Sequence, residues 1–469
     1  MRESAVSAPP GAGILQRPYL LVTVGACALV FLAAFESLAV TTVMPVVSRE
    51  LGGASLYALA FAGPLATGVI GMVGAGNWSD RRGPVGPLLA SVAVFALGLL
   101  VAGTASTMWA VVAGRLVQGL GGGAMTVALY VVVARVYPAV LHPKIFAAFS
   151  AAWVIPSLVG PFAAGLVAQL ASWHWVFLGV VVLVLPALAM LFPALRGVRS
   201  GNANGNGPAG GSGGGSASDP AGSLVPWAPG RLAWAALAAL AVLGLNLSSG
   251  LPVAGPLLAG AAVVIALLAV RPLVPRGTLT ARRGLPSVIL IRGLVAAGFF
   301  GAEVYLPYLL VERYAFSPTF AGLTLTGGAL AWAAASGVQS RLGGRLGSPV
   351  AVLIGSVMVL LAIALALVTT ALGWPAAVAI AGWVLAGGGM GLMYPRLSVM
   401  TLALSTPDTE GFNSSAMSIS DSLGGALSLA ATGIVFTAFT TTAASFAGVF
   451  VLTAVIAAAA VAIAPRVAR

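Results

Sequence analysis

Charge is what this sequence of 469 residues has least of. Only 7% of the residues are Asp, Glu, Lys or Arg, whereas 59% are hydrophobic. A soluble protein of this length needs far more charge on its surface, so we predict an all-α polytopic membrane protein. The net charge of +12 is spread as single basic residues between apolar runs. Nucleic-acid binding needs clusters of such residues, so we expect no nucleic-acid partner.

Cysteine, lysine and histidine are also scarce. The single cysteine, Cys27, excludes an internal disulfide and a cysteine-based metal site. The only lysine, Lys144, is not part of a G-x-x-x-x-G-K-[ST] sequence, so the chain has no phosphate-binding loop for ATP. Two separated histidines without an H-E-x-x-H sequence argue against a zinc protease. We therefore expect no enzyme activity, no cofactor and no metal site.

Long apolar runs predict the transmembrane helices, because each is close to the roughly 20 residues that cross a bilayer. Residues 1–18 form a tail that we expect to be disordered, and residues 19–197 then contain six spans. Residues 285–465 contain six more. The Gly- and Ser-rich stretch at 198–229 predicts a flexible linker between these halves.

Residues 230–271 decide the number of spans. The run from Leu232 to Val270 contains no charged residue and is too long for one crossing. Residues 246–252, near its middle, are typical of a turn. We therefore predict a two-helix hairpin inserted between two six-helix bundles, which gives fourteen transmembrane helices.

The distribution of basic residues sets the orientation. If both termini are cytoplasmic, most basic residues, including Arg396, fall on the cytoplasmic side. Only Arg49 and Arg313 fall outside, while Arg115 and Arg292 lie within spans. We expect a multi-pass protein of the inner or plasma membrane with both termini inside.

An internal repeat relates the two halves. Residues 113–121 read AGRLVQGLG and residues 381–389 read AGWVLAGGG, so the glycines at the second, seventh and ninth positions coincide. Parallel repeats of this kind occur in transporters whose two halves share one fold.

Three acidic residues lie within predicted spans, namely Glu36, Glu303 and Asp421. A charged side chain at the membrane centre costs roughly 2.5–3.5 kcal/mol, so each is a functional candidate by default. Glu36 and Arg115 lie at similar depths and can pair if their spans adjoin. Asp421 can reach the level of Arg292. The alternative is that these groups form static ion pairs that fix helix packing.

Glu303 is our main candidate for proton coupling. Arg292 lies eleven residues earlier, near three helical turns, so both residues share one face of a span with Phe299. At about 16 Å along the helix, Arg292 is too distant to hold Glu303 ionised, and burial should favour the protonated carboxyl. Phe299, Gln118 and Tyr305 are our candidates for the wall of a substrate cavity.

A small charged island lies between two apolar runs, and it reads GNWSDRRG from Gly76 to Gly83. Gly76 permits close packing, and Gly83 permits the positive φ of a tight turn. Asp80 can accept backbone N–H groups or pair with an arginine. From these residues alone, the island can also be a solvated turn between two membrane helices.

The pattern G-x-x-x-D-R-x-G in this island resembles the signature loop of the major facilitator superfamily. The resemblance implies that Asp80 and Arg81 lock this loop against neighbouring helices in one state of the transport cycle. Pro84 and Val85 depart from the pattern, because the family usually carries basic residues there.

Two further motifs resemble the drug/proton antiporter branch of the same superfamily. Arg115 begins the first, R-x-x-Q-G-x-G-G. The second is P-x-x-x-G-P-x-x-A-G and contains Gly160, Pro161 and Gly165, with Pro156 and Ala164 departing from the usual pattern. A Gly-Pro sequence permits close helix contact and a bend, which suits a moving interface, although simple packing would also explain it.

Two other segments are similar to signatures of the fourteen-span exporters, with Glu for Asp in residues 36–45 and His for Arg in residues 173–177. The resemblance implies a proton-coupled antiporter that exports small lipophilic or cationic compounds and uses the proton gradient instead of a cofactor. We expect a monomer in the lipid bilayer. Export of a lipid or an endogenous metabolite is the alternative. A membrane-embedded enzyme or sensor would be favoured if the buried acids proved dispensable.

Overall fold

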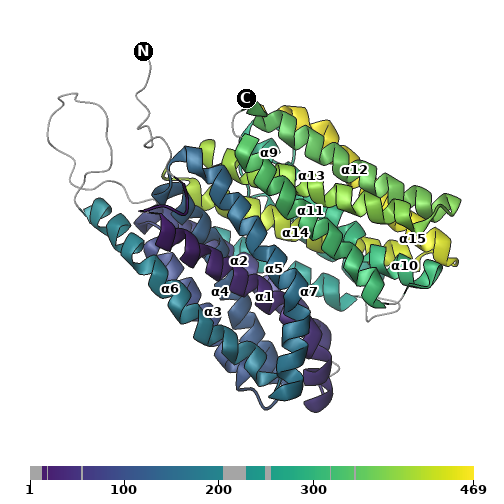
Figure 1. The fold of residues 1–469 in the computed structure, drawn as a ribbon, viewed down its shortest axis with the longest axis horizontal. Helices are drawn as coiled ribbons and strands as arrows, with labels where there is room; N and C mark the ends of the chain where they lie inside the picture. Colours follow the sequence, from purple (N-terminus) through teal and green to yellow (C-terminus); the bar gives the residue numbers. More distant parts are fainter. Residues whose placement is uncertain are drawn as a thin grey trace.

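The computed structural model describes residues 13–17, 19–53, 56–203, 229–248, 255–316, 318–342 and 345–468. All regular elements in these ranges are helices, as the composition predicts. Figure 1 shows two bundles, one coloured purple to blue and one green to yellow, which converge at the end that carries both termini and diverge at the other. Most of the predicted tail and linker lies outside the described residues.

The N-terminal bundle is built around a core of buried aliphatic and aromatic residues that extends from Val22 to Leu191. Within it, α4 packs against α2 and α3, while α1 packs against α5 and α6. Its helices are α1 (Leu20–Glu50), α2 (Tyr57–Arg82), α3 (Val85–Gly103), α4 (Met108–Val136), α5 (His142–Leu170) and α6 (His174–Ala203).

The C-terminal bundle repeats this arrangement around its own core. Here α13 packs against α11 and α12, while α9 packs against α14 and α15. Its helices are α9 (Leu285–Glu303), α10 (Tyr305–Tyr314), α11 (Pro318–Leu342), α12 (Ser348–Leu372), α13 (Ala376–Ala403), α14 (Glu410–Thr437) and α15 (Thr442–Ile463).

The glycines of the predicted repeat occupy corresponding contacts in the two bundles. Gly119 of α4 packs against the backbone of α2, and Gly387 of α13 packs against the backbone of α11. Likewise, Gly121 packs against α3 and Gly389 packs against α12. The repeat seen in the sequence therefore reflects equivalent close helix contacts, which small residues allow.

The most extensive contacts between the bundles involve four helices. The helix α2 contacts α14, and α5 contacts α11, so each bundle contributes one helix to each contact. We call these two contacts the seam. Smaller contacts of α4 with α14 and of α5 with α13 also join the halves. A change in the relative orientation of the halves must therefore alter the seam.

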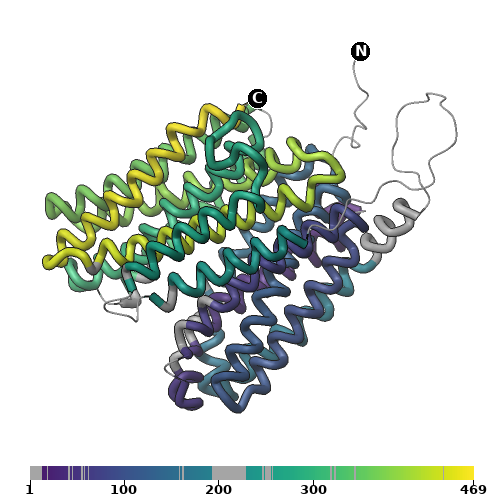
Figure 2. Tube along the Cα trace, turned by 180° about the vertical axis from the view of Figure 1, so that it is seen from behind, coloured from purple at the N-terminus to yellow at the C-terminus, as the bar shows by residue number. Residues whose placement is uncertain are grey.

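Two shorter helices, α7 (Pro229–Ser248) and α8 (Gly255–Val270), pack against each other beside the seam. They share an apolar cluster with α2, α9 and α14 that includes Val73, Ala238, Ala269 and Met417. Figure 2 shows these teal helices between the two bundles. Of the turn predicted at 246–252, residues 246–248 are the end of α7, and residues 249–252 lie outside the described residues.

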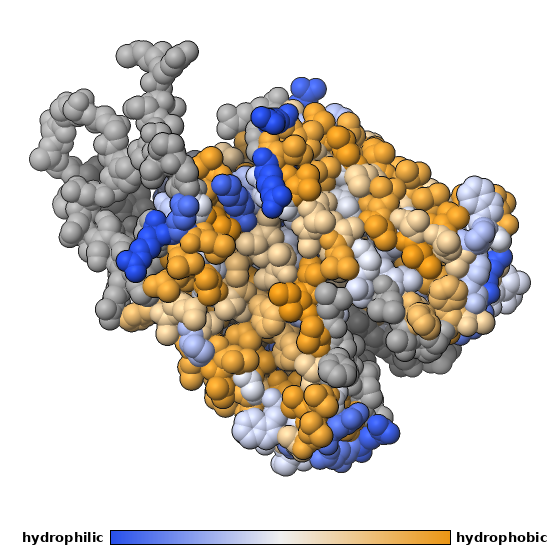
Figure 3. All heavy atoms as spheres, in the orientation of Figure 1, coloured by the Kyte–Doolittle hydropathy of each residue, from blue (hydrophilic) through white to orange (hydrophobic). Residues whose placement is uncertain are grey.

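The outer surface is suited to a bilayer. Within the described residues, eleven segments are long and apolar enough to cross a membrane, and α7 and α8 contain shorter apolar segments. On the face shown in Figure 3, orange apolar residues cover most of the surface, and blue residues gather near its ends. The chain is therefore a multi-pass membrane protein.

The structure differs from the sequence prediction at three helix boundaries. The charged island is helical, because α2 continues to Arg82 and ends only at Gly83, which has a φ of 78°. The helix α6 includes residues 198–203, which the prediction assigns to the linker. One predicted span, at 286–311, is two helices that meet at Val304. Pro307 explains this break, because it lacks the N–H that would bond the carbonyl of residue 303.

Arg396, which the count of basic residues places on the cytoplasmic side, has a buried side chain. It lies within α13, beside Gln339 of α11. With the amide oxygen of Gln339 turned toward it, Arg396 donates from Nη2 at 3.2 Å. A buried partner explains how this arginine can lie within a helix that is long and apolar enough to cross a membrane.

Candidate functional site

The predicted pairing of Glu36 with Arg115 is present in the structure. Arg115 of α4 donates from Nη1 to Oε1 of Glu36 on α1, and the two side chains are only 7% and 4% exposed. The same guanidinium donates to Oε1 of Gln118 at 2.5 Å and to the carbonyl of Ala60 at 3.2 Å. These bonds offset the cost of burying both charges and tie α1, α2 and α4 together. A role of the pair in proton coupling stays a prediction.

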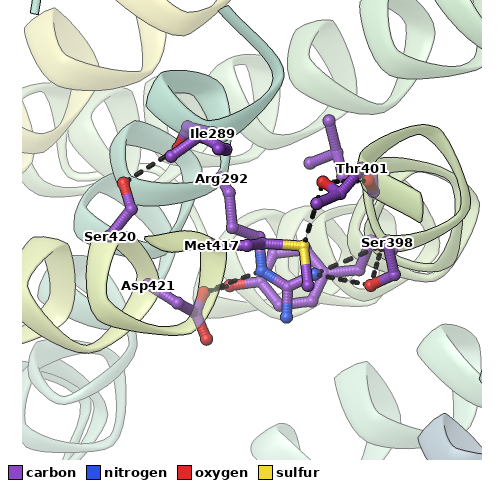
Figure 4. A network of polar contacts seen from close by, with 9 residues as sticks. Ile289, Arg292, Ser398, Thr401, Met417, Ser420 and Asp421 are labelled. Atoms are coloured by element: carbon purple, nitrogen blue, oxygen red, sulfur yellow. Dashed lines mark hydrogen bonds and ion pairs between the residues drawn. The ribbon is translucent and has the colours of Figure 1, made fainter. Parts of the chain in front are cut away.

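A second ion pair, in which the arginine is buried and the acid is half-buried, joins the C-terminal helices. Arg292 of α9 donates from Nε to Oδ1 of Asp421 on α14 at 3.0 Å. Its guanidinium lies over the ring of Tyr394 on α13, 3.5 Å from the ring centroid, and Tyr394 donates its hydroxyl to Oδ1 of Asp421. Figure 4 shows this arrangement, in which Arg292 points between Asp421 and Ser398. One arginine thus connects three helices.

Sequence reasoning missed Tyr394 and Ser398, although both accept hydrogen bonds from Arg292. The guanidinium donates from Nη1 to the carbonyl of Tyr394 at 3.2 Å and to Oγ of Ser398 at 3.4 Å. They lie i and i+4 on α13, so helical spacing shows that they share a face. The sequence does not show which helix that face meets.

Glu303 differs from the other two membrane acids. It is the last residue of α9 and is half-buried. None of the ion pairs in the described part of the chain includes it. Its carboxyl lies beside Trp383, whose indole Nε1 is buried without a hydrogen-bond partner of standard geometry. Glu303 is therefore an acid without a basic partner here, whereas Glu36 and Asp421 are each held by an arginine.

The structure does not place Phe299 or Gln118 on an open surface. Phe299 is 3% exposed and stacks on Trp383 with ring centroids 5.0 Å apart, while Trp332 packs edge-on at 5.7 Å. Gln118 is 4% exposed, and its amide oxygen accepts a hydrogen bond from Arg115. In this conformation, the predicted cavity wall at these two positions is closed by packing.

Tyr305, the third candidate for the cavity wall, is more accessible. It begins α10, is half-buried and packs against Phe436 of α14, with centroids 5.2 Å apart. Tyr305 and Glu303 lie on either side of the break at Val304. An acid and an aromatic hydroxyl therefore flank the break.

The predicted signature segment, Gly76 to Gly83, contacts the start of α14 through Asp80, near the end of α2. Asp80 accepts the N–H of Gly411 through Oδ1 at 2.6 Å and the N–H of Phe412 through Oδ2 at 2.8 Å. These N–H groups belong to the first turn of α14, where a carboxylate also interacts favourably with the helix dipole. We call this contact the latch. Of the two partners foreseen for Asp80, the structure selects the backbone.

Gly76 lets the latch form. A Cβ at this position would lie 2.6 Å from the carbonyl oxygen of Gly411, so any side chain would push α2 and α14 apart. Arg81 is half-buried at the end of α2.

An ion pair that sequence reasoning missed supports the latch. Arg135, at the end of α4, donates from Nε to Oε2 of Glu410 at 3.1 Å and from Nη2 to the carbonyl of Pro407 at 2.7 Å. Glu410 is the first residue of α14, a position that favours an acid. The sequence could have indicated Glu410 only by its place at the start of a helix, because its partner Arg135 is far away along the chain.

The Gly-Pro motif lies on α5, the helix that meets α11 at the seam. A Cβ on Gly160 would be 3.7 Å from side-chain atoms of Phe35 and Leu38, so this glycine faces α1. The helix continues unbroken through Pro161 and Gly165. The motif therefore lies on a helix that contacts both its own bundle and the other half.

No group of three or more His, Cys, Asp or Glu residues gathers among the residues that the structure describes. The family model described as Major Facilitator Superfamily matches residues 26–429. The chain belongs to the major facilitator superfamily.

Relatives within this superfamily are transporters. A probable multidrug-efflux transporter of Mycobacterium tuberculosis is 27% identical over 413 residues, which cover 84% of this chain and 83% of the relative. A transporter of Penicillium citrinum is 34% identical over 169 residues, but the match covers only 36% of this chain and 29% of that protein. With the family match, these relatives indicate a transporter and not an enzyme.

Solved structures show the same fold. A human organic anion transporter has a TM-score of 0.67 at 18% identity, covering 94% of this chain and all of that one. A bacterial homologue of the iron transporter ferroportin, solved in an outward-facing state, has a TM-score of 0.68 at 12% identity, with coverages of 95% and 98%. At such low identity the likeness concerns the fold alone.

Proposed function

We propose that this transporter is a proton-driven antiporter that exports small lipophilic or cationic compounds. The names of several relatives support export, because they include probable multidrug-efflux and efflux transporters. Buried carboxylates support protons as the coupling ion, since they are suited to carry protons within a membrane. No described residues form a metal site that would suggest another chemistry.

The same proposal assigns fourteen membrane segments. The helices α1 to α6 and α11 to α15 supply one each, and α9 with α10 supplies another. The pair α7 and α8 supplies the inserted hairpin. The Asp80 end is then cytoplasmic, and the latch closes that side of the transporter. The convergence of the bundles at this end supports a conformation that is closed there.

The environment of Glu303 is the observation that best supports proton coupling. It lies at the helix break, is half-buried, and has no basic partner in the described residues. Without a fixed counter-charge, the balance between its neutral and charged forms depends on protons and on cargo. When deprotonated, it attracts a cationic compound. When protonated, it releases that compound, so proton and cargo compete for one site.

Uptake of dye into inverted membrane vesicles, where the cytoplasmic face points outward, tests this assignment. Glu303→Gln should abolish accumulation of a lipophilic cationic dye driven by a pH gradient, and should flatten the pH dependence of dye binding. Glu312→Gln is the matched control, because Glu312 is exposed on α10 and undergoes the same chemical change. If the Glu303 variant still accumulates dye against its gradient, coupling belongs to another acid, with Glu36 and Asp421 the next to test.

A further inference from the structure

The face of the α7–α8 hairpin that points away from the seam contains an apolar groove. Trp234 and Leu237 of α7 line one side, and Ile265 and Leu268 of α8 line the other, around a volume of about 610 Å³. All four side chains are at least one-third exposed. Because the opposite face of the hairpin is buried against α2 and α14, this groove faces the surroundings of the protein.

One end of the groove is positive. Arg271 and Pro272 complete its lining immediately after α8 ends at Val270, and the Arg271 side chain is exposed. The following loop adds Arg276, Arg282 and Arg283, all exposed. The sequence contains no acidic residue between Asp219 and Glu303 to neutralise them. None of the ion pairs among the described residues includes these four arginines. The groove thus joins an apolar channel to a basic end.

This combination matches the chemistry of an acidic membrane lipid. Its acyl chain needs only apolar contact, and its phosphate needs a cation at the membrane surface. A soluble protein partner would need polar or charged groups along the groove, and the sequence from Leu232 to Val270 contains no charge. Apolar contact alone gives no preference inside a bilayer, where every neighbour is apolar. Selectivity must therefore come from Arg271.

We propose that the α7–α8 groove binds one anionic phospholipid, with an acyl chain between the two helices and the headgroup phosphate at Arg271. The bound lipid lies beside the seam, because the hairpin packs on α2 and α14. Arg231, in the first turn of α7, lies over the ring of Phe412 at 4.1 Å from the centroid. Phe412 is also a latch residue. The lipid therefore covers a hairpin that is in direct contact with the latch.

Native mass spectrometry of the full-length detergent-purified protein tests the site, with phosphatidylglycerol and phosphatidylcholine as the two probes. The wild type should retain one phosphatidylglycerol in preference to phosphatidylcholine. Arg271→Gln should lower this preference about fivefold, as expected for one arginine near an anionic surface. Arg271→Lys should restore it. Lys144→Gln removes an exposed positive charge elsewhere and should change nothing.

A second variant tests the groove independently of charge. Leu268→Trp should fill the channel and reduce retention of phosphatidylglycerol, whereas Leu257→Trp, at a more exposed position of the same helix outside the groove, should not. Thermal melting confirms that each variant is folded. Equal retention of the two lipids by the wild type, or equal effects of the Arg271 and Lys144 variants, would overturn the proposal. So would undiminished retention by folded Leu268→Trp.

Discussion

At the scale of single residues, Arg115 and Arg292, which each pair with an acid, differ from Glu303, which has no basic partner among the described residues. Arg115 and Arg292 each make bonds to a carboxylate and to other groups, so neither can leave its partner without exposing several buried acceptors. Such an arrangement favours holding helices in register. Glu303 has no such contact with a base and can change its charge with less structural cost.

The Glu36–Arg115 pair should therefore act mainly as a structural unit. Glu36→Gln or Arg115→Gln alone leaves one buried charge without its partner, which typically costs about 3–5 kcal/mol. The double variant removes both charges and should recover part of the lost stability. Melting temperatures of the four proteins in one detergent measure this. Additive losses in the double variant would show that the two side chains do not depend on each other.

Asp80 should control the exchange between states and not cargo affinity. Asp80→Asn keeps one acceptor oxygen but loses the charge and one bond to the first turn of α14. Hydrogen bonds to charged groups contribute about 1.5–3 kcal/mol, so the closed conformation should lose roughly 10- to 100-fold in population. Transport should slow while cargo binds almost normally.

Asp408→Asn is the control for that variant, because Asp408 is exposed just before α14 and has the same side chain. Transport rates in vesicles and equilibrium binding of the dye should be compared for both proteins. A large loss of dye binding by a folded Asp80→Asn protein would mean that Asp80 helps to build the binding site.

The sequence could predict a residue's depth in the membrane but not its full set of contacts. Depth follows from the helical rise, so position alone showed that Glu36 and Arg115 lie at matching levels and can pair if their helices adjoin. Tyr394, Ser398 and Glu410 could not be found this way. Their partners lie on other helices, and the rotation of each helix about its axis depends on tertiary packing.

At the scale of helices, close packing depends on a few glycines. Apolar runs and turn residues predicted most helices, because the bilayer fixes their length and composition. The break at Val304 and the helical state of the charged island escaped prediction. Both depend on local backbone hydrogen bonding, since Pro307 interrupts one helix and no proline or glycine within residues 77–82 interrupts the other.

Neighbouring glycines on α4 offer a direct test of this packing. A Cβ on Gly123 would overlap the carbonyl oxygen of Gly68 on α2, whereas a Cβ on Gly122 would meet only the Phe95 ring, at 3.6 Å. Gly123→Ala should therefore lower the melting temperature in detergent, and Gly122→Ala should leave it nearly unchanged. Equal melting of the two variants would show that α2 and α4 can separate at little cost.

At the scale of the whole molecule, the two halves meet mainly through α2 with α14 and α5 with α11. Figure 1 shows them converging at the end that carries the termini. The motifs on α2 and α5 indicated which helices have special roles, and the structure shows that both lie at the seam. The sequence contained no signal for the conformation adopted, because two states of a transporter share the same spans and motifs.

Cargo accumulation in proteoliposomes under an imposed pH gradient tests the central claim most directly. The full-length protein should move a lipophilic cationic dye against its concentration gradient, toward the acidic side, and a protonophore should abolish that movement. Dye accumulation should rise with the size of the pH gradient. If dye only equilibrates, at a rate and extent independent of the pH gradient, the protein is not a proton-driven antiporter for that cargo class.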